Sequence, residues 1–566
     1  MKICFNGASE TVTGSSYLVQ TENFKLLIDC GMFQGSKAVK ELNYGDFPFD
    51  PQTVDAMILT HAHIDHSGLI PKLIKNGFHG PIYTTKETID FCSVLLPDSG
   101  HIQEMEIERK NRKRTRADLP LLKPIYTAQD GYDAVKAFVP IKYEESLLLS
   151  PGISAQFYDA GHILGSAHVV LSIDEGGTTK RILFSGDIGT ANQPYIEDPT
   201  TIQEADFIIM ETTYGDRVHT DKEKRMEILA DIINQAHAKG GNIIIPAFAL
   251  ERTQDILYFL QKLQSAGKIP VLPVYIDSPL AVAATKIFIK DTENFDDESS
   301  DLIEKGINPL TMENLHFSET TDESIQLNQI SGGAIIISAS GMADAGRIKH
   351  HLKHNLWRPN ATVIFVGYQA EGTLGRRLIE GAKEVTIHGE TISVNAQIAR
   401  LPGFSAHADQ TELLNWVKTA GAKAQQIILV HGEESSIDQF SLLIENNLGK
   451  KPIVPVLGEC IEFKGQDVIR TQPEKPWLEA MQEKVAQAAQ KPAEDQGAKH
   501  TDRKYTSPRL ARTRRISLSE VNHSYNKLRK NLKNFMDGAR SERDYNLLID
   551  TFEKISKMLQ EASNNK

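Results

Sequence analysis

Cysteine is scarce in this chain of 566 residues. Only four cysteines are present, at positions 4, 30, 92 and 460, and no C-x-x-C motif occurs. A disulfide framework and a thiolate zinc site are therefore not expected, and a reducing cytoplasm fits this composition. Long apolar runs are also missing, so no transmembrane helix is predicted. The first residues lack the apolar stretch and cleavage site of a signal peptide, which argues against secretion.

A basic surplus is absent as well. Lysine and arginine total 62 against 74 acidic residues, which gives a formal net charge of −12. Proteins that bind nucleic acid over a whole face are usually basic, so any contact of this acidic chain with nucleic acid must come from local basic patches. One patch is RKNRKRTR at 109–116, and another comprises Arg509, Arg512, Arg514 and Arg515. Charge runs are usually solvated faces, but 109–116 is the best candidate footprint for a nucleic-acid backbone.

The length predicts two or three domains. In the first two hundred residues, short apolar runs alternate with helical patterns, which indicates α/β layers. The predicted strands there are 25–29, 56–60, 168–173 and 181–185, and the predicted helices are 70–76 and 86–96. From about 210 to 390, runs that are apolar on both faces indicate a buried parallel sheet in a second α/β domain. Its predicted strands are 241–246, 333–338 and 362–366, with a helix at 253–265.

The composition changes after about residue 470. Residues 471–500 are rich in Gln, Lys, Glu, Ala and Pro and read as a linker. Two apolar series with heptad spacing follow, each after a capping-box pattern, at Ser517 and at Ser541. These series predict a helical hairpin, which either packs on its own chain or joins two copies into a homodimer.

Four potential metal ligands lie within six residues, His61-Ala62-His63-Ile64-Asp65-His66, directly after an apolar strand. A loop at a strand end can aim several side chains at one point, whereas successive residues of a strand face opposite sides. Zinc binds imidazole and carboxylate donors, so the motif predicts a zinc site. The alternative, a surface histidine cluster, does not explain the aspartate or the buried strand before it.

The motif resembles H-x-H-x-D-H, the signature of the metallo-β-lactamase fold, and the resemblance extends to about residue 465. Matching pieces are Asp29 after an apolar strand, His162 in DAGHILGSA and Asp187 in FSGD. The resemblance implies two zinc ions, one held by His61, His63, His162 and Asp187, and the other by Asp65, His66 and the bridging Asp187. Asp29 would either orient the histidine loop from behind or cap its strand.

Three further motifs resemble those of the β-CASP nucleases, a subfamily with a second domain inserted into this fold. They are ETTYG from Glu211, FSAHAD around His407, and LVHGE around His431. The expected architecture is α/β: a metallo-β-lactamase αββα sandwich with an inserted α/β β-CASP domain and a C-terminal helical extension. The expected boundaries are 1–205 and 395–465 for the sandwich, 206–394 for the insertion, 466–500 for the linker and 501–566 for the hairpin.

The third motif separates substrates within this subfamily. The RNA-cleaving branch, which includes the pre-mRNA end-processing endonuclease and its prokaryotic relatives, has a histidine there, and the DNA-repair branch typically has an apolar residue. His431 therefore implies an RNA substrate and completes the second zinc set. Endonuclease activity is favoured, with 5′ exonuclease activity open. Two alternatives are an inactive RNA-binding scaffold, which would have lost metal ligands, and a small-molecule hydrolase, which would not need the β-CASP motifs.

The implied chemistry needs an acid as well as metal. Two zinc ions about 3.5–4 Å apart can share a hydroxide nucleophile and clamp the phosphoryl oxygens. The leaving oxygen then needs a proton, for which His407 is the candidate donor, with Glu211 holding its other nitrogen. Asp65, His407 and Glu211 are therefore the predicted catalytic residues. The alternative for His407 is a purely structural hydrogen bond.

Phosphate groups also need hydrogen-bond donors. Ser338, Ser340 and Gly341 follow a strand and have little bulk, so their N–H groups could approach an anion. Arg252 and Arg376 are candidate phosphate clamps, with an interdomain salt bridge as the equal alternative for each. His350, His351 and His354 have a spacing that could bind metal on a helix, but no acidic residue accompanies them, so a plain helix face is favoured.

Overall fold

The computed structural model describes residues 1–203, 205–219, 224–367, 369, 372–464, 467–481 and 554. The predicted C-terminal hairpin except for residue 554, most of the predicted linker and the arginine group at 509–515 lie outside these residues. Within the described part of the chain, none of the helices has the length and apolar character needed to cross a membrane.

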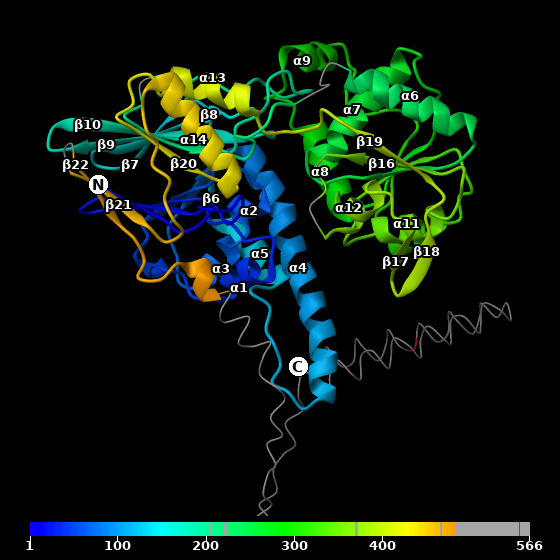
Figure 1. The fold of residues 1–566 in the computed structure, drawn as a ribbon, viewed down its shortest axis with the longest axis horizontal. Coiled ribbons are helices and arrows are strands. Elements are labelled where there is room, and N and C mark those ends of the chain that lie inside the picture. Colours follow the sequence, from blue (N-terminus) through cyan, green and yellow to red (C-terminus); the bar gives the residue numbers. More distant parts are fainter. Residues whose placement is uncertain are drawn as a thin grey trace, which may run out of the picture. The chain divides into compact units, whose positions relative to one another are not determined.

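Two sheets form the first domain (Figure 1). The first has the order β22 (Asp467–Thr471), β21 (Cys460–Lys464), β1 (Lys2–Phe5), β2 (Tyr17–Gln20), β3 (Lys25–Ile28), β4 (Ala56–Ile58), β5 (Ile82–Thr84) and β6 (Phe138–Pro140). The second has the order β20 (Gln426–Val430), β11 (Phe207–Glu211), β10 (Thr178–Phe184), β9 (Ala167–Glu175), β8 (Ile153–Asp159) and β7 (Ser146–Ser150).

Alternate residues of these strands build the core between the two sheets. Leu26 and Ile28 of β3 share one apolar cluster with Ile182 and Phe184 of β10. Residues in between face outward and are covered by helices. Leu27 packs with α3 (Ile70–Lys75) and α4 (Lys86–Arg116), and Leu183 packs with α13 (Gln410–Ala420) and α14 (Glu434–Leu448). The layers are therefore α, β, β and α, which confirms the predicted sandwich.

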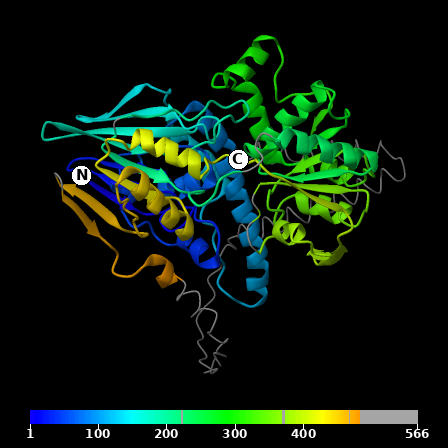
Figure 2. The same cartoon turned by 45° about the horizontal axis from the view of Figure 1, so that its top comes forward.

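The inserted domain has one six-stranded sheet in which every pairing is parallel. Its order is β14 (Leu315–Phe317), β13 (Val274–Ile276), β15 (Ile335–Ser338), β12 (Ile243–Pro246), β16 (Thr362–Val366) and β19 (Gln397–Leu401). Ile243 and Ile244 belong to different apolar clusters, so both faces are buried, as predicted. Figure 2 shows helices on both sides of this sheet.

The helices of the inserted domain are α6 (Arg225–Ala238), α7 (Arg252–Ser265), α8 (Pro279–Lys290), α9 (Asp297–Glu304), α10 (Thr321–Leu327), α11 (Ile348–Asn355) and α12 (Leu374–Ile379). A small hairpin, β17 (Glu384–Ile387) and β18 (Glu390–Ser393), accompanies them. The first domain also contains the short helices α1 (Lys37–Glu41), α2 (Ile64–Ser67) and α5 (Ala128–Ala134). Single 3₁₀ turns lie at Leu42–Tyr44, Pro51–Thr53 and Val135–Ala137.

The predicted boundaries differ from the observed ones at three places. β11 starts after residue 206 but pairs with β10 and β20, so it belongs to the sandwich. β19 starts after residue 395 but pairs with β16 of the inserted sheet. β22, placed in the predicted linker, pairs with β21 as an edge strand. Apolar runs of similar length serve both sheets, so the sequence pattern could not assign each strand to its sheet.

Two other expectations were wrong. The helix predicted at 86–96 is α4, which continues to Arg116 through the basic run. Cys4 and Cys460 form a disulfide, although no disulfide was expected. These two cysteines stand opposite each other on the neighbouring antiparallel strands β1 and β21. The pairing joins residues 456 positions apart, which the sequence spacing does not reveal.

Candidate metal centre and acid site

The histidine loop leaves the end of β4 and is fixed by the segment that follows β3. The backbone N–H groups of Cys30 and Met32 donate to the carbonyls of His66 and Ile64, at 2.8 and 2.9 Å. Gly31 lies so close that a Cβ there would be 1.6 Å from the Asp65 carbonyl oxygen. The close approach of these two segments therefore requires glycine at position 31.

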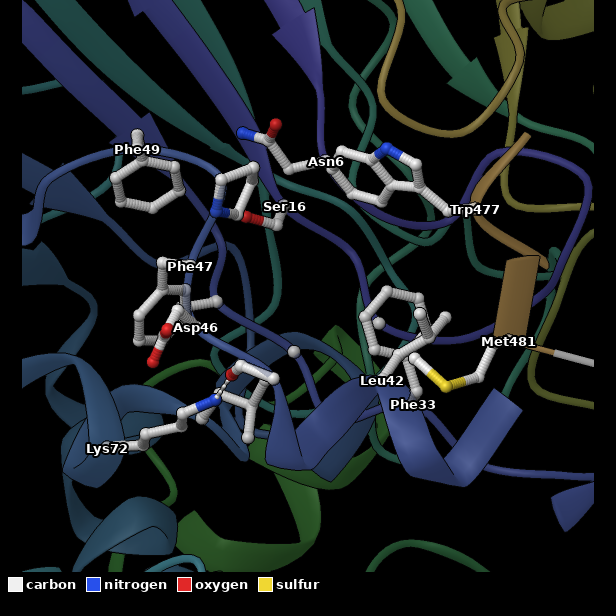
Figure 3. Close-up of a pocket in the computed structure, with 16 residues that line it drawn as sticks. Asn6, Ser16, Phe33, Leu42, Asp46, Phe47, Phe49, Lys72, Trp477 and Met481 are labelled. Atoms are coloured by element: carbon white, nitrogen blue, oxygen red, sulfur yellow. Dashed lines mark hydrogen bonds between the residues drawn. The ribbon is translucent and has the colours of Figure 1, made fainter. Parts of the chain in front are cut away.

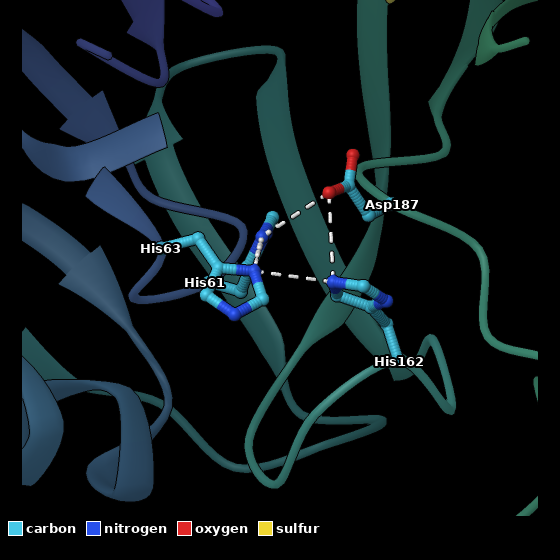
Figure 4. Close-up of side chains that lie close together, drawn as sticks. All are labelled: His61, His63, His162 and Asp187. Carbon is cyan, nitrogen blue, oxygen red and sulfur yellow. Dashed lines mark hydrogen bonds and ion pairs between the residues drawn. The ribbon is translucent and has the colours of Figure 1, made fainter. Parts of the chain in front are cut away.

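Four side chains of the predicted first zinc set converge (Figure 4). His63 Nδ1 lies 3.1 Å from His61 Nε2 and 3.2 Å from His162 Nε2. Asp187 Oδ2 lies 3.4 Å from His61 Nε2 and 3.5 Å from His162 Nε2. Ligands about 2.0–2.1 Å from a tetrahedral zinc ion would be roughly 3.3 Å apart, so these four atoms suit one zinc ion.

The second predicted set lies on the other side of Asp187. His66 Nε2 is 3.3 Å from both His431 Nε2 and Asp187 Oδ1, and Asp65 Oδ2 is 3.8 Å from His431 Nε2. Asp187 Oδ1 is buried and has no hydrogen-bond donor among the described residues. A buried carboxylate oxygen without a donor is costly unless a cation is nearby. The two oxygens of Asp187 thus face two ligand sets, and the donors fit metal.

Hydrogen bonds on the far side of the rings orient the second set. Asp29 Oδ2 lies 2.7 Å from His66 Nδ1, and its Oδ1 accepts the Thr60 N–H at 2.8 Å. Thr213 Oγ1 lies 3.1 Å from His431 Nδ1. These contacts leave Nε2 of His66 and His431 for the metal position. Asp29 therefore supports the histidine loop, one of the two roles considered for it, while the roles of Thr60 and Thr213 were not predicted.

His407 and Glu211 meet beside the metal ligands. His407 Nδ1 is 3.1 and 3.2 Å from the two oxygens of Glu211, and His407 Nε2 is 3.9 Å from Asp187 Oδ2. The backbone N–H of Ile188 donates to Glu211 at 2.5 Å and fixes the buried carboxylate. Burial opposes protonation of the ring, but the carboxylates of Glu211 and Asp187 outweigh it and raise the pKa of His407 to about 9. The carboxylates of Glu211 and Asp187 thus favour the charged form of the imidazole beside the metal position.

The predicted phosphate-binding residues are placed less favourably. Ser338 is buried, and its hydroxyl donates to the Asp277 carbonyl at 2.7 Å. Ser340 and Gly341 follow β15, where Gly341 packs against Phe248. Both arginines form an ion pair with a carboxylate a few residues along the chain: Arg252 with Asp255 at 2.7 Å, and Arg376 with Glu380 at 2.6 Å.

The three histidines of α11 do not form a metal group among the described residues. His351 is buried, and its Nε2 lies 2.6 Å from Asp277 Oδ2. The same carboxylate accepts from Ser324 and Ser318, at 2.6 and 2.8 Å, and from Arg347 at 2.7 Å. His351 therefore belongs to a buried hydrogen-bond network around Asp277, an acidic partner that the local sequence did not reveal.

A cleft of about 480 Å³ opens beside the acid site, lined by residues of both domains. Tyr214, whose ring centroid is 5.9 Å from that of His407, lines the cleft together with Ser405. Arg400 at the end of β19 is exposed and also lines the cleft. No motif marked Arg400 in the sequence, because it becomes relevant only when β19 joins the inserted sheet.

A second cavity, of about 200 Å³, lies behind the loop that follows β3 (Figure 3). Its wall is largely apolar and aromatic, with Phe33, Phe47 and Trp477 among the lining residues. None of the metal ligands lines it, and Lys72 at its edge donates to the Asn43 carbonyl at 2.9 Å. This cavity is therefore separate from the metal centre.

Comparisons with known proteins agree with this geometry. Residues 10–231 match the metallo-beta-lactamase superfamily, 253–378 match the Beta-Casp domain, and 391–455 match the Zn-dependent metallo-hydrolase RNA specificity domain. Ribonuclease TTHA0252 of Thermus thermophilus is 36% identical over 468 residues, which cover 83% of this chain and 97% of that protein.

Two archaeal proteins of Methanocaldococcus jannaschii are also similar. Transcription termination factor FttA is 33% identical over 475 residues, which cover 82% of this chain and 72% of the factor. An RNase J-like protein is 32% identical over 464 residues, which cover 81% of this chain and 98% of that protein. The likeness to all three relatives spans both the sandwich and the inserted domain.

Proposed function

This chain belongs to the β-CASP family of the metallo-β-lactamase superfamily, whose members are metal-dependent hydrolases, and we propose that it hydrolyses phosphodiester bonds in RNA with two zinc ions per chain. One observation carries the proposal. Asp187 presents one oxygen to each of two ligand sets, and the His407–Glu211 pair lies next to the same carboxylate. This arrangement suits the displacement of an alkoxide from phosphorus, which needs charge neutralisation on one side and a proton on the other.

The seven predicted metal ligands would form two sets that share Asp187. His61, His63 and His162 with Asp187 would hold one ion, and Asp65, His66 and His431 with Asp187 would hold the other. When bound, the zinc ions would supply a nucleophile at neutral pH and neutralise charge on the phosphoryl oxygens. The contacts of Asp29 with His66 and of Thr213 with His431 hold these two imidazole rings in orientation.

His407 is the proposed general acid. Its Nδ1 is engaged by Glu211, so Nε2 is the nitrogen that faces the reacting groups. Glu211 stabilises the charged imidazolium, and the neutral ring that remains after proton transfer keeps its orientation through the same contact. Burial of Glu211 and its bond from Ile188 prevent the carboxylate from moving away.

The cleft beside His407 is the proposed path of the RNA strand. Tyr214, the partly exposed aromatic residue of its lining, offers a face for an unstacked base, and the exposed Arg400 offers a charge for a phosphate. The N–H groups at Ser340 and Gly341 remain further candidates. Arg252 and Arg376 would have to share or leave their carboxylate partners to bind phosphate.

Relatives support RNA as the substrate, since the curated proteins similar to this chain include a ribonuclease and an RNase J-like protein. Between the two modes of cleavage, we favour internal cleavage over 5′ exonuclease action.

We also propose that the protein is located in the cytoplasm. A homodimer through residues 501–566 is also proposed. The Cys4–Cys460 disulfide opposes a cytoplasmic location, because a cytoplasmic thiol pool would keep both cysteines reduced. The redox state of the pair in protein isolated under thiol-blocking conditions tests the location.

The test compares single-stranded RNA and DNA of one sequence, each incubated with zinc-loaded protein. We expect RNA to be cut in clear preference, and equal or faster cutting of DNA would overturn the proposal. RNA with a labelled 3′ end and either a 5′ triphosphate or a 5′ monophosphate separates the two modes. Internal cleavage is indifferent to the 5′ group, whereas exonuclease action requires the monophosphate.

A further inference from the structure

The second half of α4 extends beyond the helices that pack against its first half (Figure 1). Ile107 is the last buried residue of this 31-residue helix, and residues 117–124 run back beside it. The exposed end carries six cations within eight residues and no acid: Arg109, Lys110, Arg112, Lys113, Arg114 and Arg116. We call this end, residues 108–124, the basic arm.

Hydrogen bonds show which side of the arm faces its own return segment. The Asn111 side chain bonds the backbone of Leu122 in both directions, at 2.8 and 2.9 Å, and Arg114 Nε donates to the Pro120 carbonyl at 2.6 Å. At 100° per residue, Asn111 and Arg114 lie 60° apart on one side of the helix. That side is therefore occupied by the chain itself.

The opposite side carries a row of four cations. Arg109, Arg112, Lys113 and Arg116 have the spacing i, i+3, i+4 and i+7, which places them within an arc of about 100° centred opposite the Asn111 and Arg114 side. We call them the cationic row. It is about 10 Å long, from the rise of 1.5 Å per residue. The helix geometry thus separates these four charges from Lys110 and Arg114, the other two cations of the run.

Little on the chain neutralises the row. Arg112 bonds Glu108 at 2.8 Å, but both side chains are largely exposed, and exposed pairs contribute little. Arg109, Lys113 and Arg116 have no ion-pair partner among the described residues. A concentrated positive row on a chain with a net charge of −12 creates a local positive potential that attracts an anionic partner.

We propose that the cationic row binds the phosphate backbone of RNA, at nucleotides away from the bond that is cut. The proposal rests on the proposed ribonuclease function. RNA suits the row because its four members are all cations at helical spacing, which matches a line of phosphates. Ile102 and Met105 are exposed on the same face of α4, one to two turns before the row, so an apolar protein partner is the competing outcome of the test. Rows of arginine and lysine without base contacts hold a nucleic-acid backbone irrespective of sequence.

The test compares two double variants with the same loss of charge. Arg109→Gln with Arg116→Gln removes both ends of the row, and Lys110→Gln with Lys123→Gln removes two exposed cations that lie off it. Both pairs are made in a His407→Ala background, so that binding is measured without cleavage. The probe is a labelled single-stranded RNA of about 30 nucleotides, and its dissociation constant is followed from low to high salt.

Each phosphate contact in a single strand contributes about −0.7 to the slope of log K against log salt. The row variant should therefore lose about 1.4 from this slope and bind roughly tenfold more weakly at low salt. The control should lose less than half as much. An RNA of about 5 nucleotides that occupies only the cleft should bind both variants alike.

Equal salt slopes for the two variants on the long RNA would overturn the proposal. This is also the result expected if the row binds an acidic protein instead of RNA. If the row variant lost as much affinity for the short RNA as for the long RNA, a contact away from the cleavage site would also be contradicted. The proposed function fails separately, if the protein with His407 intact does not cleave RNA.

Discussion

His407 is bonded through Nδ1 to Glu211, 3.1 Å away, while its Nε2 lies 3.9 Å from Asp187 Oδ2. One imidazole thus connects a buried carboxylate to the carboxylate that both metal sets share. The two functions of the site, metal binding and proton donation, meet at this ring but use different residues. Substitutions should therefore separate them.

Replacing Glu211 with glutamine should change the pH dependence of cleavage. The acid must be protonated to act, so the rate falls as pH rises through the pKa of His407. Loss of the Glu211 charge lowers that pKa, and the alkaline limb of the rate profile should move to lower pH by about one to two units. A single-turnover pH profile checks this, with Glu145→Gln, an exposed glutamate, as the control. An unchanged alkaline limb would contradict the role of Glu211.

Replacing His63 with alanine should release metal, since His63 Nδ1 contacts the ligand atoms of both His61 and His162. We expect zinc content to fall from about two ions to about one per chain. Affinity at the first set should weaken by more than the roughly 10–100-fold typical of an outer partner. The matched control is His79→Ala, an exposed histidine. Elemental analysis after dialysis measures both, and two tightly bound ions in His63→Ala would refute the assigned ligand set.

Asp29 should act on metal binding without touching metal. Asp29→Asn keeps the shape but weakens the contact that orients His66, so zinc affinity at the second set should fall by about 10–100-fold. Asp55→Asn, at an exposed carboxylate that accepts the Lys25 N–H, should leave affinity unchanged. Competition with a chromogenic chelator gives both values. Equal affinities for the two variants would show that Asp29 only caps its strand.

Asp277 should stabilise the inserted domain in a pH-dependent way. Burial favours its neutral form, but bonds from His351, Ser324 and Arg347 outweigh burial and lower the pKa of Asp277 to about 2. Its contribution is therefore complete above the unfolded pKa of about 3.9 and is lost as pH falls through about 2.

Asp277→Asn should lower the free energy of unfolding by about 3 kcal/mol at neutral pH, because the buried donors around position 277 lose the negative charge of their acceptor. The loss should shrink below about pH 4. Denaturant unfolding at several pH values measures this, with Glu319→Gln at an exposed ion pair as the control. A loss that is independent of pH would contradict the assigned ionisation.

Local spacing made the metal loop predictable, because one strand end and six residues determine where His61, His63 and Asp65 lie. The buried strands were equally clear. The sheet to which β11 and β19 belong was not, since their apolar runs suit either sheet. The helical continuation of α4 was hidden by its basic run. Arg252 was chosen for its charge, although Asp255, three residues later, is its natural partner on a helix.

The central claim is that His407 supplies the proton while the metal ligands hold zinc. The decisive measurement is the single-turnover rate of zinc-loaded His407→Ala on RNA and on a nitrophenyl phosphodiester, whose leaving group needs little protonation. We expect a loss of about 10²–10⁴-fold on RNA, a much smaller loss on the activated ester, and an unchanged zinc content. Equal losses on both substrates, or loss of zinc, would show that His407 is a structural or metal-supporting residue.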